Sequence, residues 1–163
     1  MSIFHDRAEL GLNRSEVLLA CWFGAGLTKK APGTIGSLTA LPFAAMLMML
    51  GGAPLLAVAA LVLLPTGAMQ AERIGRRGAL DPGYIVVDEV VGQWLALLPA
   101  ALNIWHFAAG FALFRLFDII KPGPIRILDQ RVKGGWGVMT DDVAAGLVSA
   151  AILLGLRYFD VLP

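Results

Sequence analysis

A long stretch without a single charge constrains this chain more than any other feature of its sequence. From Ala31 to Ala71 the chain contains no Asp, Glu, Lys, Arg or His. A membrane-spanning helix needs about 20 apolar residues, so this stretch is too long for one span and long enough for two. The turn signal Gly51-Gly52-Ala53-Pro54 divides it near its middle. We therefore expect a helical hairpin, with helices at about Ser37–Leu50 and Pro54–Ala71.

The same reasoning predicts further helices on both sides of this hairpin. Ser37 is expected to be the N-cap of the first hairpin helix, which is short enough either to span or to re-enter. A second stretch without Asp, Glu, Lys or Arg, interrupted by a proline, predicts helices at about Ile85–Leu102 and Ile104–Ile120. A helix at about Val143–Leu156 would be capped by Thr140 or Asp141. The short apolar stretch Glu16–Leu27 predicts an interfacial or half-buried helix.

Composition supports an integral membrane protein. Hydrophobic residues make up 58% of the chain and charged residues 15%, against about 25% charged residues in soluble domains. Thirteen basic and 12 acidic residues give a net charge of +1, which excludes a disordered chain and a nucleic-acid binder. A single cysteine excludes a disulfide scaffold. We expect an all-α, polytopic membrane helical bundle of about four to five transmembrane helices plus a short N-terminal interfacial helix, forming one domain over residues 1–163.

The charged residues are distributed unevenly between the connections of this bundle. The turns at Gly51–Pro54 and Asn103–Trp105 carry no Asp, Glu, Lys or Arg. The other connections contain nearly all the basic residues, namely Lys29, Lys30, Arg73, Arg76, Arg77, Lys121, Arg126, Arg131 and Lys133. Positively charged loops stay in the cytoplasm, so these connections, and the acidic residues near them, are expected at the cytoplasmic face.

Acidic residues next to these connections are the first candidates for chemistry. Asp88 and Glu89 interrupt an apolar run, where a carboxylate costs about 2.5–3.5 kcal/mol at membrane depth and needs a compensating partner. Asp118 lies at the end of a predicted helix, three residues after Arg115, and could instead form a structural ion pair with it. The pair Asp141-Asp142 could equally serve to complement a helix N-terminus.

Together these carboxylates suggest a hard divalent cation. Mg²⁺ prefers oxygen ligands and typically uses carboxylates together with substrate phosphate. Softer metals lack ligands here, since the chain has one cysteine and two widely separated histidines. The predicted metal ligands are Asp88, Glu89, Asp118, Asp141 and Asp142.

Basic residues beside the acids suggest a phosphate-bearing substrate, although they could also be ordinary cytoplasmic-side charges. Arginine matches phosphate oxygens with a planar fork, and lysine adds a point charge. Residues 121–126 (KPGPIR) are expected to form a stiff loop, because its two prolines fix the backbone. The glycine turn before Ser37 could offer free N–H groups to an anion. The predicted phosphate-binding residues are Lys121, Arg126, Arg115, Arg131, Thr34 and Ser37.

Four sequence blocks, in order, resemble the phosphatidylglycerophosphatase A family. They are residues 32–38 (PGTIGSL), 85–94 (IVVDEVVGQW), 114–126 (FRLFDIIKPGPIR) and 134–146 (GGWGVMTDDVAAG). The resemblance implies a Mg²⁺-dependent enzyme of the bacterial inner membrane. It also implies the reaction, removal of the terminal phosphate of phosphatidylglycerophosphate to give phosphatidylglycerol.

The sequence leaves the nucleophile, the exact substrate and the class of protein undecided. The expected catalytic residues are Asp88, Glu89, Asp118, Asp129 and Asp142, with either a metal-activated water or the carboxylate of Asp118 or Asp129 as the nucleophile. The substrate could instead be another lipid or isoprenoid phosphate. The chain could also be a non-enzymatic cation-transport protein, because acids inside membranes also mark ion pathways. The partners expected are the phospholipid substrate and the bilayer, while the sequence leaves the oligomeric state open.

Overall fold

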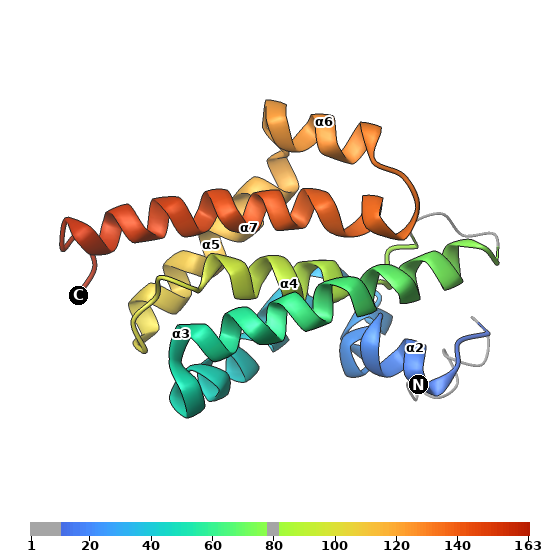
Figure 1. Cartoon of the computed structure of the whole chain (residues 1–163), viewed down its shortest axis with the longest axis horizontal. Helices are drawn as coiled ribbons and strands as arrows, with labels where there is room; N and C mark the ends of the chain where they lie inside the picture. Colours follow the sequence, from blue (N-terminus) through green and yellow to red (C-terminus); the bar gives the residue numbers. More distant parts are fainter. Residues whose placement is uncertain (1–10, 78–81) are drawn as a thin grey trace.

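The computed structural model describes residues 11–77 and 82–163, and within these ranges the chain is helical and contains no β-strand. The elements are α2 (Arg14–Leu19), the 3-10 helix η1 (Trp22–Leu27), α3 (Pro32–Gly75), α4 (Val87–Ala96), α5 (Ile104–Ile120), α6 (Gly123–Arg131) and α7 (Gly134–Tyr158). Figure 1 shows them as an elongated bundle. The prediction of an all-helical fold is confirmed for these residues, and the short N-terminal helix appears as α2 and η1.

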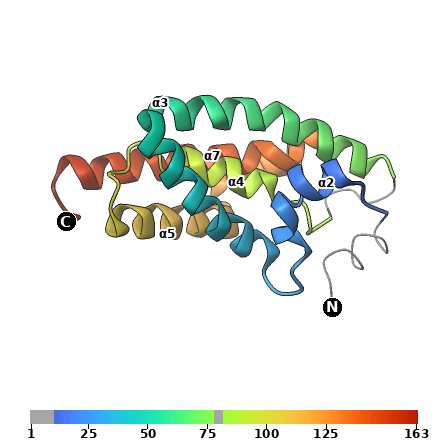
Figure 2. The same ribbon diagram turned by 90° about the horizontal axis from the view of Figure 1, so that it is seen from below.

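The predicted hairpin is confirmed within α3. Gly51 and Gly52 leave helical geometry, and Gly52 has a φ of +68°, which favours glycine. The chain doubles back there, so that α3 consists of two helical segments, 32–50 and 53–75 (Figure 2). The first segment begins at Pro32, because a proline suits the first turn of a helix. The expectation that Ser37 is an N-cap is therefore wrong.

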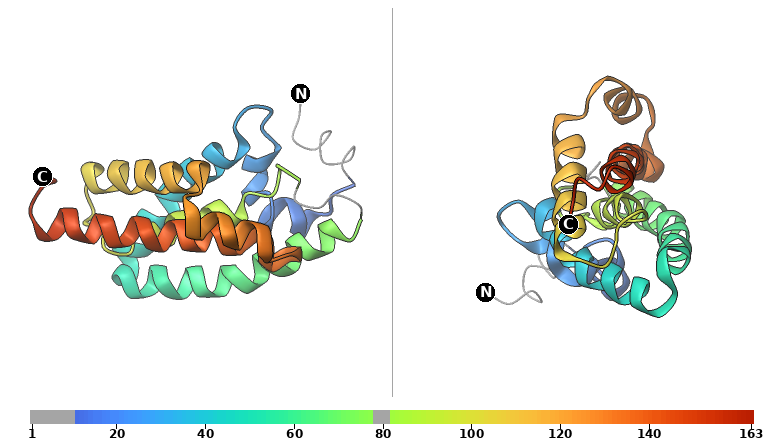
Figure 3. Two further views of the ribbon diagram at one scale, coloured as in Figure 1. Left: turned by 90° about the horizontal axis from the view of Figure 1, so that it is seen from above. Right: turned by 90° about the vertical axis from the view of Figure 1, so that its left-hand side faces the viewer.

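Helix α4 lies at the centre of the bundle, between α3, α5 and α7 (Figure 3, right). Eight of its ten residues are buried, and the Trp94 indole donates to the carbonyl of Ala40 on α3 at 3.1 Å. The prediction of a helix over 85–102 is too long. Pro99 has no N–H and its ring would clash with the carbonyl four residues earlier, so α4 ends at Ala96.

Helix α5 spans Ile104–Ile120, as predicted. Helix α7, however, begins at Gly134, so Thr140 and Asp141 are interior residues and neither caps it. Asp141 and Asp142 therefore do not complement the N-terminus of this helix. The loop expected at 121–126 is also wrong beyond Pro122, because Gly123 and Pro124 begin α6.

The uncharged turns lie together at one end of the bundle. The turn at Gly51-Gly52, the connection from α4 to α5 and the C-terminus occupy the left-hand end in Figure 1. The side chain of Asn103 donates to the carbonyl of Pro163 at 3.1 Å, which confirms that two of these segments meet. Two helices, α3 and α7, are long and apolar enough to cross a membrane.

Candidate active site

The first turn of α4 presents Asp88 and Glu89 to the interior. Its start is held by the N-terminal region, because the backbone N–H groups of Val86 and Val87 donate to the carbonyl of Ala20 at 2.8 and 3.2 Å. Asp88 Oδ1 accepts from the backbone N–H of Glu89 at 3.0 Å. Carboxylates are favoured at a helix N-terminus, where the N–H groups are free and the helix dipole is positive. The position of both residues in the first turn of α4 therefore stabilises their carboxylates.

A glycine contact between α4 and α7 brings Asp142 to this pair. A Cβ on Gly146 would lie 2.4 Å from the carbonyl oxygen of Gly92, and a Cβ on Gly92 would lie 2.7 Å from the carbonyl oxygen of Asp142. The backbones of the two helices can approach this closely only because both residues lack a side chain. One oxygen each from Asp88, Glu89 and Asp142 consequently lies within 4.8 Å of the others.

Helix α5 adds Arg115 and Asp118 on the other side of Glu89. Arg115 Nη1 lies 2.5 Å from Asp118 Oδ2 and 3.9 Å from Glu89 Oε1. The same nitrogen donates to Ser37 Oγ at 3.4 Å, and that hydroxyl donates to the carbonyl of Gly33 at 2.9 Å. Arg115 is therefore held by three elements, with only 14% of its side chain exposed. The ion pair expected from sequence exists, and it forms part of the pocket wall.

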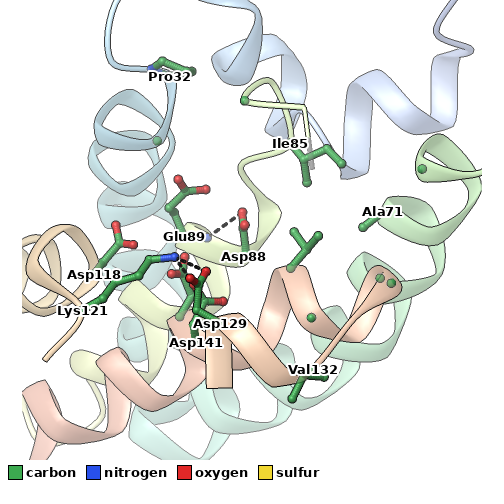
Figure 4. A pocket seen from close by; sticks show the side chains of 18 of the residues that line it. Pro32, Ala71, Ile85, Asp88, Glu89, Asp118, Lys121, Asp129, Val132 and Asp141 are labelled. Atoms are coloured by element: carbon green, nitrogen blue, oxygen red, sulfur yellow. Dashed lines mark hydrogen bonds and ion pairs between the residues drawn. The ribbon is translucent and has the colours of Figure 1, made fainter. Parts of the chain in front are cut away.

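Lys121 connects α5 to α6 and α7. Its ammonium group lies 2.7 Å from Asp129 Oδ1 and also forms an ion pair with Asp141 (Figure 4). Partial burial lowers the pKa of Lys121, but the hydrogen bonds from its ammonium group to Asp129 and Asp141 outweigh this and raise its pKa above the usual value. The lysine is therefore positively charged throughout the physiological range.

These groups line one pocket of about 980 Å³. The structure brings together nine of the residues singled out from the sequence: Thr34, Asp88, Glu89, Arg115, Asp118, Lys121, Asp129, Asp141 and Asp142. Figure 4 shows the carboxylates of α4, α5, α6 and α7 turned toward one another. Ser37 is buried beneath the pocket and contributes through its hydrogen bond from Arg115.

The structure does not bring Arg126 and Arg131 to the pocket. Both are exposed on α6. On that helix Ile125 is buried and Asp129, four residues later, lines the pocket, so these two residues share the inward face. The expectation that the two arginines bind the substrate phosphate is therefore not supported by their positions.

Three charged residues that were not predicted to belong to the site also line the pocket, namely Glu72, Arg76 and Lys133. Glu72 Oε2 accepts from the backbone N–H of Gly135 at 2.8 Å, and its other oxygen pairs with Arg76 at 3.1 Å. A signal for Glu72 was present, because it is the first charged residue after the uncharged stretch. The first charged residue after such a stretch is expected at the end of the hydrophobic helix, where the other charged residues of the site also lie.

The carboxylates fit a hard cation. Asp88 and Asp142 are buried, and Glu89 Oε2 and Asp142 Oδ2 have no hydrogen-bond partner among the described residues. Three carboxylates this close repel one another, and a divalent cation would remove the repulsion and supply the missing contacts. In the described ranges, no histidine or cysteine joins the cluster, so the donor set is oxygen alone. Such a set suits Mg²⁺.

Sequence comparison identifies known proteins that are similar to this chain over most of its length. The family profile described as phosphatidylglycerophosphatase A matches residues 18–157. The phosphatidylglycerophosphatase A of Escherichia coli (strain K12) is 39% identical over 149 residues, covering 90% of this chain and 86% of that protein. The protein of the same name from Haemophilus influenzae is 38% identical, covering 87% of this chain and 88% of that protein.

A third relative has a different name. A Bacteroides thetaiotaomicron protein that carries the provisional name phosphatidylinositol-3-phosphatase is 42% identical over 157 residues, covering 87% of this chain and 93% of that protein. No solved structure matches the chain significantly. Since the family profile covers most of the sequence, and two named relatives cover it at nearly 40% identity, the chain belongs to the phosphatidylglycerophosphatase A family.

Proposed function

We propose that this protein hydrolyses the terminal phosphomonoester of phosphatidylglycerophosphate, releasing phosphatidylglycerol and inorganic phosphate. The observation that carries the proposal is the pocket in which Asp88, Glu89 and Asp142 face Arg115 and Lys121. A phosphate dianion together with a divalent cation requires this combination of acids and bases. The names of the Escherichia coli and Haemophilus influenzae relatives supply the substrate.

In this proposal the protein is a multi-pass protein of the bacterial inner membrane, with the pocket at the cytoplasmic face. The two segments of α3, together with α5 and α7, cross the bilayer, and α4 is enclosed between them. At 1.5 Å per residue these helices are about 25 to 37 Å long, comparable to the hydrocarbon core of about 30 Å. Helix α4, about 15 Å long, is too short to cross as a helix. The basic residues at the pocket end support the cytoplasmic orientation.

Mg²⁺ is the proposed cofactor, with Asp88, Glu89 and Asp142 as ligands and Asp118 and Asp141 close by. When bound, the ion would polarise a phosphate oxygen and favour deprotonation of an attacking water. Arg115 would neutralise the charge that develops on the phosphoryl oxygens, and Lys121 would add a second positive charge. Attack on phosphorus breaks the bond to the glycerol oxygen, which leaves as the alcohol after taking a proton.

The nucleophile is either water or a carboxylate, Asp118 or Asp129. Asp118 is paired with Arg115, and Asp129 with Lys121, so either carboxylate would have to leave an ion pair before attack. A carboxylate nucleophile would form an acyl phosphate. Trapping during one turnover distinguishes the two routes, because only the covalent route yields a phosphoenzyme that hydroxylamine cleaves.

Phosphate release from phosphatidylglycerophosphate by the full chain in detergent tests the main proposal. We expect turnover that EDTA abolishes and Mg²⁺ restores, and a loss of turnover in Asp88→Asn. Activity that persists in EDTA would remove the metal from the proposal. Absence of phosphate release, combined with Mg²⁺ uptake by liposomes that contain the protein, would favour a transport function instead.

A phosphatase for another lipid phosphate is the second candidate. The Bacteroides thetaiotaomicron relative, provisionally named for phosphatidylinositol 3-phosphate, is the observation that favours it. Both substrates present a phosphomonoester on a glycerophospholipid headgroup, and the same carboxylates and bases would serve either. Competition between the two lipids in one assay decides which has the higher kcat/KM.

A further inference from the structure

A second hollow adjoins the candidate active site on the side of the bundle. It has a volume of about 310 Å³, and we call it the side groove. Three of its lining residues, Glu72, Arg76 and Gly135, also line the main pocket, so the two spaces lie next to each other. Arg73, Met69 and Trp136 line it away from the main pocket.

The side groove lies where the second segment of α3 crosses the start of α7. A Cβ on Gly135 would lie only 1.9 Å from the carbonyl oxygen of Ala68, so the helix backbones meet here. Residues 69, 72, 73 and 76 share one face of α3, because they are three to four positions apart. The side chains of this face therefore line the groove together with Trp136.

The walls of the side groove combine positive charge with apolar surface. Arg73 is exposed and makes no ion pair among the described residues. The Arg76 side chain is 78% exposed and bonds to Glu72 through its Nε, while its terminal nitrogens make no hydrogen bond to the described residues. Met69 and Trp136 are 53% and 55% exposed. Tryptophan and arginine together are typical of the depth at which lipid headgroups meet acyl chains.

We propose that the side groove binds the phosphodiester and the adjoining acyl chain of the lipid whose terminal phosphate occupies the main pocket. This inference rests on the proposed function, because it needs a glycerophospholipid substrate. Phosphatidylglycerophosphate carries a phosphodiester and a terminal phosphomonoester, which are joined by one glycerol. When the phosphomonoester occupies the main pocket, the phosphodiester must therefore lie close beside it. The groove adjoins the main pocket and offers both a guanidinium without an ion-pair partner among the described residues and an apolar rim.

The arrangement would give the enzyme a means of selecting lipids. Arg73, with Arg76, binds the phosphodiester, and Met69 and Trp136 contact the first carbon atoms of the acyl chain. A small soluble phosphomonoester has neither group and would occupy the main pocket alone. The groove therefore contributes to KM for the lipid and leaves the bond-breaking groups unchanged.

Binding of dioctanoyl phosphatidylglycerol, which has the phosphodiester but no phosphomonoester, tests the groove directly. Isothermal titration of the full chain in detergent measures its dissociation constant. In Arg73→Gln we expect that constant to rise about tenfold, because a hydrogen bond to a charged group is lost. The matched control is Arg131→Gln, which changes another exposed arginine, on α6 and outside both hollows, and should bind as the wild type does.

A second variant tests the apolar wall. Trp136→Ala should weaken binding of dioctanoyl phosphatidylglycerol but leave binding of glycerophosphoglycerol, which lacks acyl chains, unchanged. Equal weakening in Arg73→Gln and Arg131→Gln would show attraction to surface charge in general and overturn the proposal. Wild-type affinity in Arg73→Gln, or absence of binding to the wild type, would overturn it as well.

The binding measurement requires no turnover, so it tests the side groove separately from the proposed phosphatase activity. If binding depends on Arg73 but the wild type releases no phosphate from phosphatidylglycerophosphate, the groove stands and the phosphatase proposal fails. If the wild type turns over and Arg73→Gln changes neither binding nor KM, the groove fails alone. In the active enzyme, Arg73→Gln should raise KM for the lipid with kcat unchanged, and should not affect hydrolysis of glycerol 3-phosphate.

Discussion

The two ends of the bundle treat polar groups differently. At the end that carries the uncharged turns, polar side chains bind backbone: Asn103 accepts from the N–H of His106 at 2.9 Å, and Arg157 donates to the carbonyl of Pro99 at 2.8 Å. At the pocket end, carboxylates face carboxylates, and buried oxygens of Glu89 and Asp142 have no partner among the described residues. The polar groups named at the first end stabilise turns and helix ends, although the Nε2 atom of buried His106 there also has no partner among the described residues. Those at the second end are arranged for a ligand.

The largest difference in activity between the two ends is expected when Asp142→Asn at the pocket end is compared with Asp160→Asn at the other end. Removing one of three clustered carboxylates should lower phosphate release about 10³-fold, because a bound cation contributes several kcal/mol and each 1.4 kcal/mol is worth a factor of ten. The Mg²⁺ concentration for half-maximal activity should also rise. Asp160→Asn, beyond the other end of α7, is the control and should retain wild-type activity. Similar activities in the two variants would contradict the metal site.

Arg115→Lys should have the next largest effect. The variant keeps the positive charge but loses the guanidinium, whose Nη1 contacts both Asp118 and Ser37, so we expect kcat to fall about 10²-fold, as for the loss of one transition-state donor. Arg157→Lys is the matched change at the opposite end, where the side chain bonds to a turn. Steady-state kinetics of both variants would refute the assigned role if their kcat values were equal.

Gly146→Ala and Gly155→Ala compare the same substitution at two positions on α7. The new methyl group at position 146 would meet the carbonyl of Gly92, whereas no atom lies within 4 Å at position 155. We expect Gly146→Ala to lose about 1–3 kcal/mol of stability, and Gly155→Ala to gain up to about 1 kcal/mol. Thermal unfolding in detergent measures both. Equal Tm values would show that the α4–α7 contact is not close packed.

Asn103→Ala should have the smallest effect and should affect stability alone. Loss of the N-cap of α5 costs about 1 kcal/mol, while the pocket lies at the other end of the bundle. Asn103→Asp keeps a capping oxygen and should restore most of the Tm. A kcat reduced by Asn103→Ala in a fully folded protein would mean that the two ends are coupled.

The accuracy of the predicted helices depended on local signals. Helix α5 was predicted to the residue because Asn103 caps its start and Lys121-Pro122 ends it. Helix α7 begins at Gly134, much earlier than predicted. The prediction started the helix too late because two consecutive glycines are more typical of a flexible loop. There the helix is stabilised from outside, since Glu72 accepts the N–H of Gly135 and α3 packs against it. Helix α6 was missed for a similar reason, because two prolines favoured a loop and Ile125 is buried only by tertiary packing.

The sequence predicted which types of residue form the candidate site, but not all of the individual residues that line it. Acids and bases at one end of a hydrophobic chain predicted where the pocket lies. The predicted set nevertheless included Arg126 and Arg131, which α6 turns outward, and omitted Glu72, which lines both hollows. Those differences depend on which face of a helix is buried, and on a short helix with one buried apolar residue the sequence does not reveal that face.

By itself, the sequence determined the helical hairpin, the apolar character of the bundle and the end at which the charged residues gather. Each depends on composition over 15 to 40 consecutive residues, and hydrophobic free energy is additive over such stretches. Only the tertiary structure decided that Asp88, Glu89 and Asp142 form one cluster and that a groove adjoins the pocket at Gly135. Both depend on helix backbones approaching closely at Gly92, Gly146 and Gly135, and such contacts join residues that are far apart in the chain.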